Sequence, residues 1–115
     1  MERPMNFGDI VHLNWTPQAG NEMGRDHYGV VISCAQFNEL IPRVVVAPIT
    51  SKNHPEFGRL RIPIQSNQNS LTGFICLDHI RTIDPVARNL ASTGDQITST
   101  CRKECKASLS KIFSI

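Results

Sequence analysis

The sequence predicts a small, strongly curved, mainly β fold (α+β) that ends in one α-helix. Short segments rich in β-branched and aromatic residues, separated by turn residues, fill the first two thirds of the chain. An amphipathic helical pattern fills the remainder. Many short strands with one terminal helix favour a barrel-like sheet over alternating strand–helix units. The length of 115 residues predicts one domain over residues 1–115.

Six segments are predicted to be strands, and Pro48 lies inside the third of them. Proline cannot donate a hydrogen bond to a neighbouring strand, so we expect that strand to lie at a sheet edge or to be bulged there. A helical turn is predicted at residues 35–40, and a polar loop between the first two strands, up to His27. The six strand segments are 10–15, 28–34, 43–49, 60–64, 73–77 and 80–83.

The last part of the chain is predicted to be a helix capped by Asp95, because a side-chain carboxylate can accept a hydrogen bond from an amide of the first helical turn. Its cations fall largely off the apolar stripe, so we expect the apolar face to pack on the sheet. The stripe consists of Ile97, Cys101, Cys105, Leu109 and Ile112.

Charge and cysteine content restrict the partners and the compartment. A net charge of +2 is compatible with nucleic acid, but binding requires a local basic patch. The sequence has no apolar stretch of about 18 residues, and its N-terminus lacks the apolar core of a signal peptide. We therefore expect a cytoplasmic protein whose four cysteines are thiols rather than disulfides.

Four segments, in order along the chain, match motifs that occur together in one family. They are Gly8-Asp9-Ile10-Val11 with Pro17 and Gly20-Asn21-Glu22; Val30-Val31-Ile32-Ser33 with Phe37-Asn38; Val46-Ala47-Pro48-Ile49-Thr50-Ser51; and residues 73–77 followed by Asp78-His79-Ile80-Arg81-Thr82-Ile83-Asp84. In this order they resemble the PemK/MazF toxins, whose late segment reads Asp-Gln-apolar-Arg-Thr-apolar-Asp. The likeness runs over residues 8–84.

The resemblance implies an SH3-like curved β-barrel of the PemK/CcdB kind with a C-terminal helix, working as a homodimer. It implies cleavage of single-stranded messenger RNA without a metal or cofactor, by attack of the 2′-hydroxyl to leave a 2′,3′-cyclic phosphate. It also implies a cognate antitoxin of the MazE/PemI kind, a toxin–antitoxin complex that binds operator DNA, and no membrane partner.

Two positions correspond to the family's catalytic residues, and a third lies nearby. The family has Arg-Pro just before its second strand; here that position holds His27 and Tyr28, with Arg25 two residues earlier. Thr50 matches the family's threonine at the end of the third strand. An imidazole can move a proton near neutral pH, and guanidinium and hydroxyl groups can bind phosphate. We predict that His27, Thr50 and Arg25 are catalytic. The alternative is that His27 and Arg25 are solvated loop residues and that Thr50 is an ordinary residue at the end of a strand.

RNA contacts are predicted where cations and stacking side chains occur near these motifs. Gly20 and Glu22 are assigned structural roles in the loop that carries Arg25. Arg81 has a second reading, an ion pair with Asp78 across a dimer interface. The predicted RNA-binding residues are Arg81, Arg59, Lys52, Ser51, His79 and Trp15.

Three other readings stay open on the sequence alone. Zinc is the first, because two pairs of potential ligands have suitable spacing, although cysteine on an apolar helical stripe commonly packs as a small hydrophobe. The second is a non-enzymatic gyrase poison like the CcdB toxins, whose C-terminal Trp-Gly-Ile is faintly echoed by Phe-Ser-Ile at residues 113–115. The third is an RNA-binding homologue that lost activity with the family's arginine. The potential zinc ligands are Cys76, His79, Cys101 and Cys105.

Overall fold

The computed structural model describes residues 4–15 and 26–115, and these form seven β-strands and two α-helices, which confirms the mainly β class. The helix α1 (Ala35–Leu40) confirms the predicted helical turn, and α2 (Ser99–Phe113) is the C-terminal helix. Two 3-10 helices, η1 (Pro55–Leu60) and η2 (Leu77–His79), connect strands. The strands are β1 (Asp9–Asn14), β2 (Asp26–Val31), β3 (Val44–Thr50), β4 (Arg61–Pro63), β5 (Phe74–Cys76), β6 (Arg81–Ile83) and β7 (Ala91–Gln96).

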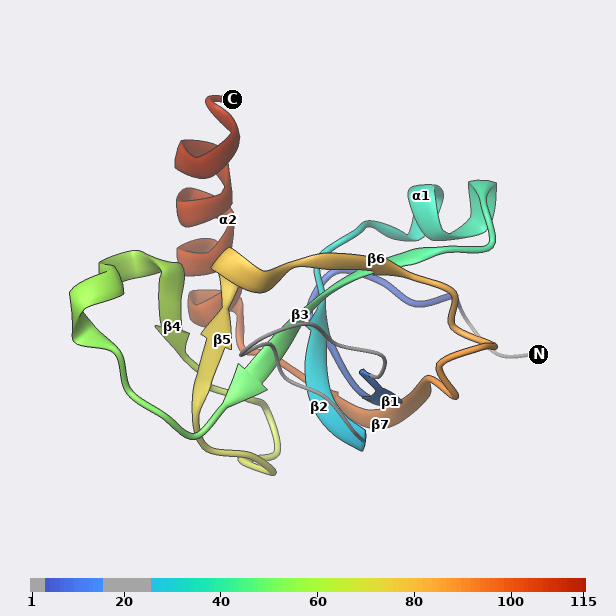
Figure 1. The fold of residues 1–115 in the computed structure, drawn as a ribbon, viewed down its shortest axis with the longest axis horizontal. Coiled ribbons are helices and arrows are strands. Elements are labelled where there is room, and N and C mark those ends of the chain that lie inside the picture. Colours follow the sequence, from blue (N-terminus) through green and yellow to red (C-terminus); the bar gives the residue numbers. More distant parts are fainter. Residues whose placement is uncertain (1–3, 16–25) are drawn as a thin grey trace.

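The strands form one antiparallel sheet in the order β4-β5-β3-β2-β1-β7, with β6 also paired to β3. The sheet is strongly curved (Figure 1), but across the described residues it does not close into a barrel. A single antiparallel bridge between Ser66 and Ile97 links the segments that follow the edge strands β4 and β7. β4 is only three residues long and ends at Pro63, beyond which the Ile64 amide still donates to the Gly73 carbonyl oxygen at 2.9 Å.

Hydrophobic side chains pack on both faces of the curved sheet. In β1, Ile10 packs into a core with Ile97 and Cys101 of the α2 region, whereas Val11 and Leu13 pack into a second core. Side chains alternate between the faces of a strand, so a strand buried on both faces has a nearly continuous apolar sequence. The predicted packing of an amphipathic C-terminal helix on the sheet is confirmed for Cys101 and Cys105, and α2 (red in Figure 1) stands beside β4 and contacts it. Of the predicted stripe, Ile97 lies before the helix and Ile112 is exposed. None of the described helices is long and apolar enough to cross a membrane.

Pro48 lies within the sheet, which corrects the edge position predicted for its strand. β3 pairs with β2 on one side and with β6 and then β5 on the other. The Ile32 amide donates to the Val45 carbonyl at 2.9 Å, and hydrogen-bonded pairs alternate with non-bonded pairs along an antiparallel ladder. The Gly29–Pro48 pair therefore falls at a non-bonded position, where β2 requires no amide hydrogen from Pro48. On its other side Pro48 lies at the change of partner from β6 to β5.

The start of α2 also differs from the prediction. Thr98 is the N-cap, because its side-chain oxygen accepts a hydrogen bond from the Cys101 amide at 3.2 Å. Asp95 lies at the end of β7, a strand that the sequence analysis did not predict. Four exposed residues of β7, with the sequence Ala-Ser-Thr-Gly, lack the apolar alternation of a half-buried strand.

Asp95 anchors the segment that follows β4 instead of capping the helix. It is 2% exposed, and its carboxylate accepts hydrogen bonds from the Gln68 amide (3.0 Å), the Ser70 hydroxyl (2.6 Å) and the Gln96 amide (2.8 Å). Burial by itself would raise the pKa of this carboxyl, but the hydrogen bonds outweigh burial and lower the pKa to about 2.

We expect Asp95→Ala to lower the free energy of unfolding by about 1–3 kcal/mol, because the donors lose their acceptor. The pKa in the folded state lies below the ordinary value of 3.8, so the stabilisation is complete at neutral pH and is lost as the pH falls from about 4 to about 2. Urea unfolding at neutral and acid pH measures the difference, with Glu39→Ala as an exposed control. A difference between wild type and Asp95→Ala that persists unchanged at the lowest pH would contradict this role.

Candidate active site

His27 and Thr50, both predicted to be catalytic, lie beside each other on the neighbouring strands β2 and β3. The β2–β3 ladder ends at the Gly29–Pro48 pair, and His27 and Thr50 each lie two residues beyond it, so the alternation of side chains places both on the face of that pair. Opposite residues of an antiparallel pair point to the same face of the sheet. The His27 Nε2–H donates a hydrogen bond to the carbonyl oxygen of Ile49, directly before Thr50. His27 thus belongs to a strand, not to the predicted loop, and its ring reaches the end of β3.

Thr50 is 8% exposed, and its backbone is closely flanked by β5. Its hydroxyl oxygen accepts a hydrogen bond from the Lys52 amide at 3.2 Å, so the hydroxyl hydrogen can be donated elsewhere. A Cβ at Gly73 would lie 2.5 Å from the Thr50 carbonyl oxygen, and Gly73 has a φ of +133°. Only glycine fits both conditions, and it allows β5 to pack against the end of β3.

Arg81 projects from the same face of the sheet as Thr50. It is paired with Val46, which lies four residues before Thr50 in β3 and therefore shares its face. Arg81 Nη1 donates to the Trp15 carbonyl oxygen at 3.0 Å, and its guanidinium carbon lies 6.0 Å from the centroid of the Trp15 ring. Among the residues that the structure describes, no carboxylate forms an ion pair with Arg81. Its charge is therefore not neutralised by any carboxylate of the described residues.

Arg61, in contrast, is neutralised by a carboxylate. Its Nε and Nη2 donate to the two carboxylate oxygens of Asp78 at 2.8 and 3.1 Å, and the hydrogen bonds raise the pKa of the guanidinium. Burial would raise the pKa of the Asp78 carboxyl, but the bonds from Arg61, a backbone hydrogen bond and the nearby charges of Arg61 and His79 together lower it. The Arg61 guanidinium also lies 4.9 Å from the ring centroid of the exposed Phe57. Arg61 therefore packs on the Phe57 ring, and its positive charge is balanced by the Asp78 carboxylate.

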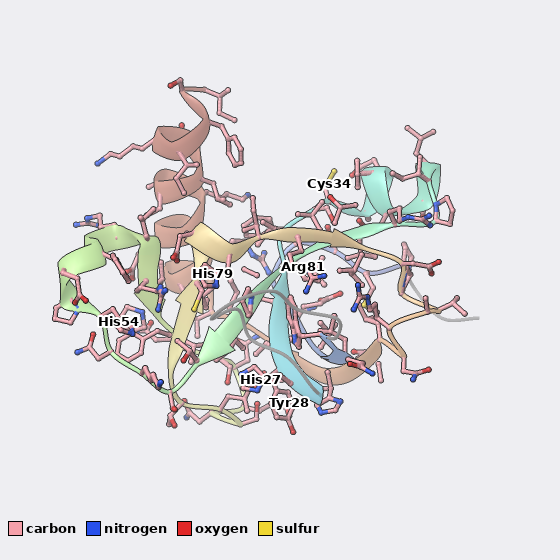
Figure 2. The ribbon with its side chains drawn as sticks, in the orientation of Figure 1. His27, Tyr28, Cys34, His54, His79 and Arg81 are labelled. Carbon is pink, nitrogen blue, oxygen red and sulfur yellow. The ribbon has the colours of Figure 1, made fainter. Side chains whose placement is uncertain are left out.

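The remaining predicted RNA-binding residues lie after β3 and in η1 and η2. Ser51 and Lys52 are exposed immediately after β3, and Arg59 is exposed in η1. His79 lies at the end of η2, 3.3 Å from the Asp78 carboxylate. Figure 2 shows His27 towards the arrowhead of β3 and Arg81 towards its middle, where it pairs with Val46, whereas Cys34 lies near α1.

The stacking role predicted for Trp15 does not fit the structure. Trp15 is 1% exposed and packs in the second core with Leu13 and Val46, so its ring presents no surface to a base. Its indole Nε1–H instead donates to the carbonyl oxygen of His27 at 3.2 Å. Trp15 thus forms hydrogen bonds with His27 and Arg81, two predicted site residues. The sequence alone could not reveal these contacts.

Three predictions concern the segment between β1 and β2. Arg25, predicted to be catalytic, and Gly20 and Glu22, predicted to be structural, lie outside the described residues. These roles stay predictions.

The cysteines are free thiols, and they do not assemble the zinc site considered above. Within residues 4–15 and 26–115, no group of three or more His, Cys, Asp or Glu side chains is placed to hold a metal ion. Cys101 and Cys105 lie on the buried stripe of α2. Cys76 is buried beside the Thr50 backbone, and burial raises the pKa of its thiol to about 11.

The chain matches a family of known toxins. The family of PemK-like, MazF-like toxins of type II toxin–antitoxin systems matches over residues 6–113. The structure resembles MazF of Deinococcus radiodurans, with a TM-score of 0.82 and 23% identity over 99% of this chain and 100% of that one. It also resembles a chain of a MazE–MazF crystal structure from the same organism, with a TM-score of 0.78 and 24% identity over 100% of this chain and 99% of that one.

A third similar structure is described as an endoribonuclease in complex with its cognate antitoxin from a mycobacterial species. Its TM-score is 0.73 and its identity 15%, over 100% of this chain and 97% of that one. Comparison with curated protein sequences gives no match. The fold and the family match together define a toxin of a type II toxin–antitoxin system. Within that class, the chain belongs to the PemK-like, MazF-like family.

We expect alkylation by iodoacetamide to distinguish Cys34 from Cys76. Cys34 is exposed, whereas Cys76 is buried, and a pKa of about 11 leaves about one thiolate in a thousand at a pH of about 8. Mass spectrometry of peptides taken at successive times should therefore show rapid modification of Cys34 and slow modification of Cys76. Equal rates in the folded protein would contradict the packing of Cys76 behind Thr50.

Proposed function

We propose that this toxin is a metal-independent endoribonuclease that cleaves single-stranded messenger RNA by attack of a 2′-hydroxyl on the adjacent phosphate. The observation that carries the proposal is the convergence of the His27 imidazole and the Thr50 hydroxyl on one face of the sheet. Arg81 shares this face and has no carboxylate partner among the described residues. A base, a hydroxyl donor and a cation are thus available to one phosphodiester.

His27 is assigned the transfer of the proton from the 2′-hydroxyl. Its Nε2–H is used by the Ile49 carbonyl, so the lone pair of a neutral ring lies on Nδ1. Nδ1 accepts the proton while the 2′-oxygen forms a bond to phosphorus and the bond from phosphorus to the 5′-oxygen breaks. Solvent protonates the leaving 5′-oxygen, and the imidazolium later returns its proton to solvent. The products are a 2′,3′-cyclic phosphate and a 5′-hydroxyl.

Thr50 and Arg81 are assigned the stabilisation of the phosphate as negative charge develops. The Thr50 hydroxyl donates to one non-bridging oxygen, and free N–H groups of Arg81 bind another. One preorganised donor of this kind is worth about 10²–10³-fold in rate by analogy with oxyanion holes. Arg25, two residues before His27 in the sequence, is proposed as a further phosphate ligand.

The RNA strand is proposed to run from this site towards η1 and η2. The exposed Lys52 and Arg59 are suited to phosphate contacts there. Phe57, with the Arg61 guanidinium on its ring and His54 at a centroid distance of 5.3 Å, is suited to stacking with a base.

The proposed protein partners are a cognate antitoxin and a second copy of the chain. The MazE–MazF complex and the mycobacterial endoribonuclease–antitoxin complex share this fold and support an antitoxin partner. The homodimer and the binding of operator DNA by the antitoxin complex are carried over from the family resemblance.

We expect the purified protein to cut single-stranded RNA in EDTA, and His27→Ala to reduce the rate by about 10²–10⁴-fold because the base is lost. Thr50→Ala should reduce it by about 10²–10³-fold, and Thr50→Ser should restore most of it. The measurement is gel analysis of RNA fragments, with assay of their cyclic phosphate ends. His12→Asn is the matched control, because His12 is an imidazole of β1 paired with Tyr28 on the other face of the sheet.

Intact RNA with folded wild-type protein, over a broad set of sequences, would contradict the enzymatic proposal. Tight binding of that RNA without cleavage would instead support the impaired RNA-binding homologue. Wild-type rates from His27→Ala would remove the proton-transfer role from this residue.

Arg81→Ala and Arg81→Lys test the phosphate role separately. We expect Arg81→Ala to lower kcat/KM by about 10–10³-fold and Arg81→Lys to recover part of the loss, because lysine keeps the charge but lacks the planar fork. Steady-state cleavage of a fluorogenic RNA measures both variants. Equal activity of wild type and Arg81→Ala would show that the phosphate is held elsewhere.

A further inference from the structure

We propose that Trp15 is a positioning residue that fixes the His27 imidazole relative to the Arg81 guanidinium. The proposal rests on the endoribonuclease function proposed above. Trp15 does not touch the substrate; it acts through the two residues that do. It is the one described residue that forms hydrogen bonds to both of them.

The two hydrogen bonds come from opposite parts of Trp15. Its side-chain Nε1–H donates to the His27 carbonyl oxygen at 3.2 Å, and its own backbone carbonyl accepts from Arg81 Nη1 at 3.0 Å. The Arg81 guanidinium also lies over the indole ring at 6.0 Å from its centroid. One rigid residue therefore sets the positions of the proposed base and the proposed phosphate ligand.

The ring is itself immobilised by its surroundings. A Cβ at Gly29 would lie 2.9 Å from Trp15 Cζ2, so β2 packs against the ring two residues beyond His27. The ring is buried, at 1% exposure, in the core that contains Leu13 and Val46. A close-packed aromatic side chain of this kind has few alternative rotamers.

His27 lies beyond the ladder between β2 and β3. That ladder ends at the Gly29–Pro48 pair, so towards β3 His27 is held by its ring bond to Ile49. On its other side the His27 backbone pairs with Leu13 of β1, and the bond from Trp15 adds a side-chain contact to its carbonyl oxygen. A displacement of a catalytic group by about 1 Å can reduce a rate by about 10²-fold.

Trp15→Phe removes the N–H donor and keeps an aromatic ring, so it tests the connection directly. We expect kcat to fall by about 10–10²-fold, with KM changed by less than about 3-fold, because the backbone carbonyl of residue 15 still binds Arg81. Ile62→Val is the matched control, since Ile62 is equally buried but lies in the core under α2. Trp15→Tyr is a second variant, which also lacks the indole N–H, in case Trp15→Phe does not fold.

A double-mutant cycle separates positioning from general destabilisation. If Trp15 acts through His27, adding Trp15→Phe to His27→Ala should change kcat by less than about 2-fold, because the positioned group is already absent. The same loss in both backgrounds would overturn the proposal.

A measurement on the free protein keeps this test separate from the proposed function. The imidazole ¹⁵N chemical shifts of His27 report which ring nitrogen carries the proton. We expect them to indicate a protonated Nε2 in wild type and in Ile62→Val, and a tautomer mixture in Trp15→Phe. Unchanged His27 shifts in folded Trp15→Phe would overturn the proposal even if wild type cleaves RNA. A wild type that leaves RNA intact would refute the endoribonuclease, while these shifts still decide whether Trp15 orients His27.

Discussion

The register between β2 and β3 determines where the side chains of this toxin can act together. His27 and Thr50 each lie two residues beyond the Gly29–Pro48 pair, so both share the face from which Arg81 extends. Because strand side chains alternate, a slip of one residue would move His27 to the other face and separate it from Thr50. The apolar residues that follow His27 in β2 are buried on both faces of the sheet, so such a slip would also disrupt both cores.

Much of the fold followed from local pattern, and the failures have physical causes. Apolar runs predicted six of the strands, and apolar residues at helical spacing predicted α2, because buried positions are occupied by apolar residues in a regular pattern. β7 was missed because its exposed residues have no such pattern. Pro48 was assigned to an edge or a bulge because the sequence shows the missing amide hydrogen but not the non-bonded position in the ladder at which none is required. Asp95 resembled a cap, but its hydrogen bonds to Gln68 and Ser70 depend on a distant segment.

The sequence suggested candidate site residues but could not show their connections. The family resemblance selected His27 and Thr50, with Arg25 nearby, as catalytic candidates, and Arg81 was selected as an RNA-binding cation. His27, Thr50 and Arg81 share one face of the sheet, whereas Arg25 lies outside the described residues. The resemblance could not show that Arg61 is neutralised by Asp78 while Arg81 has no carboxylate partner among the described residues. Nor could it show that Trp15 is buried, since a tryptophan near basic residues reads equally well as a stacking surface. Such distinctions depend on contacts between segments far apart in the sequence.

The central claim is that His27 and Thr50 act on the same phosphodiester. The most direct measurement is a crystal structure with a short RNA that carries the mapped cleavage sequence and a single 2′-deoxy substitution at the reacting nucleotide. The account predicts that the scissile phosphate accepts a hydrogen bond from Thr50 Oγ1 and that the 2′ carbon lies next to Nδ1 of His27. A scissile phosphate bound away from either residue, in protein shown to cut the unmodified RNA, would contradict it.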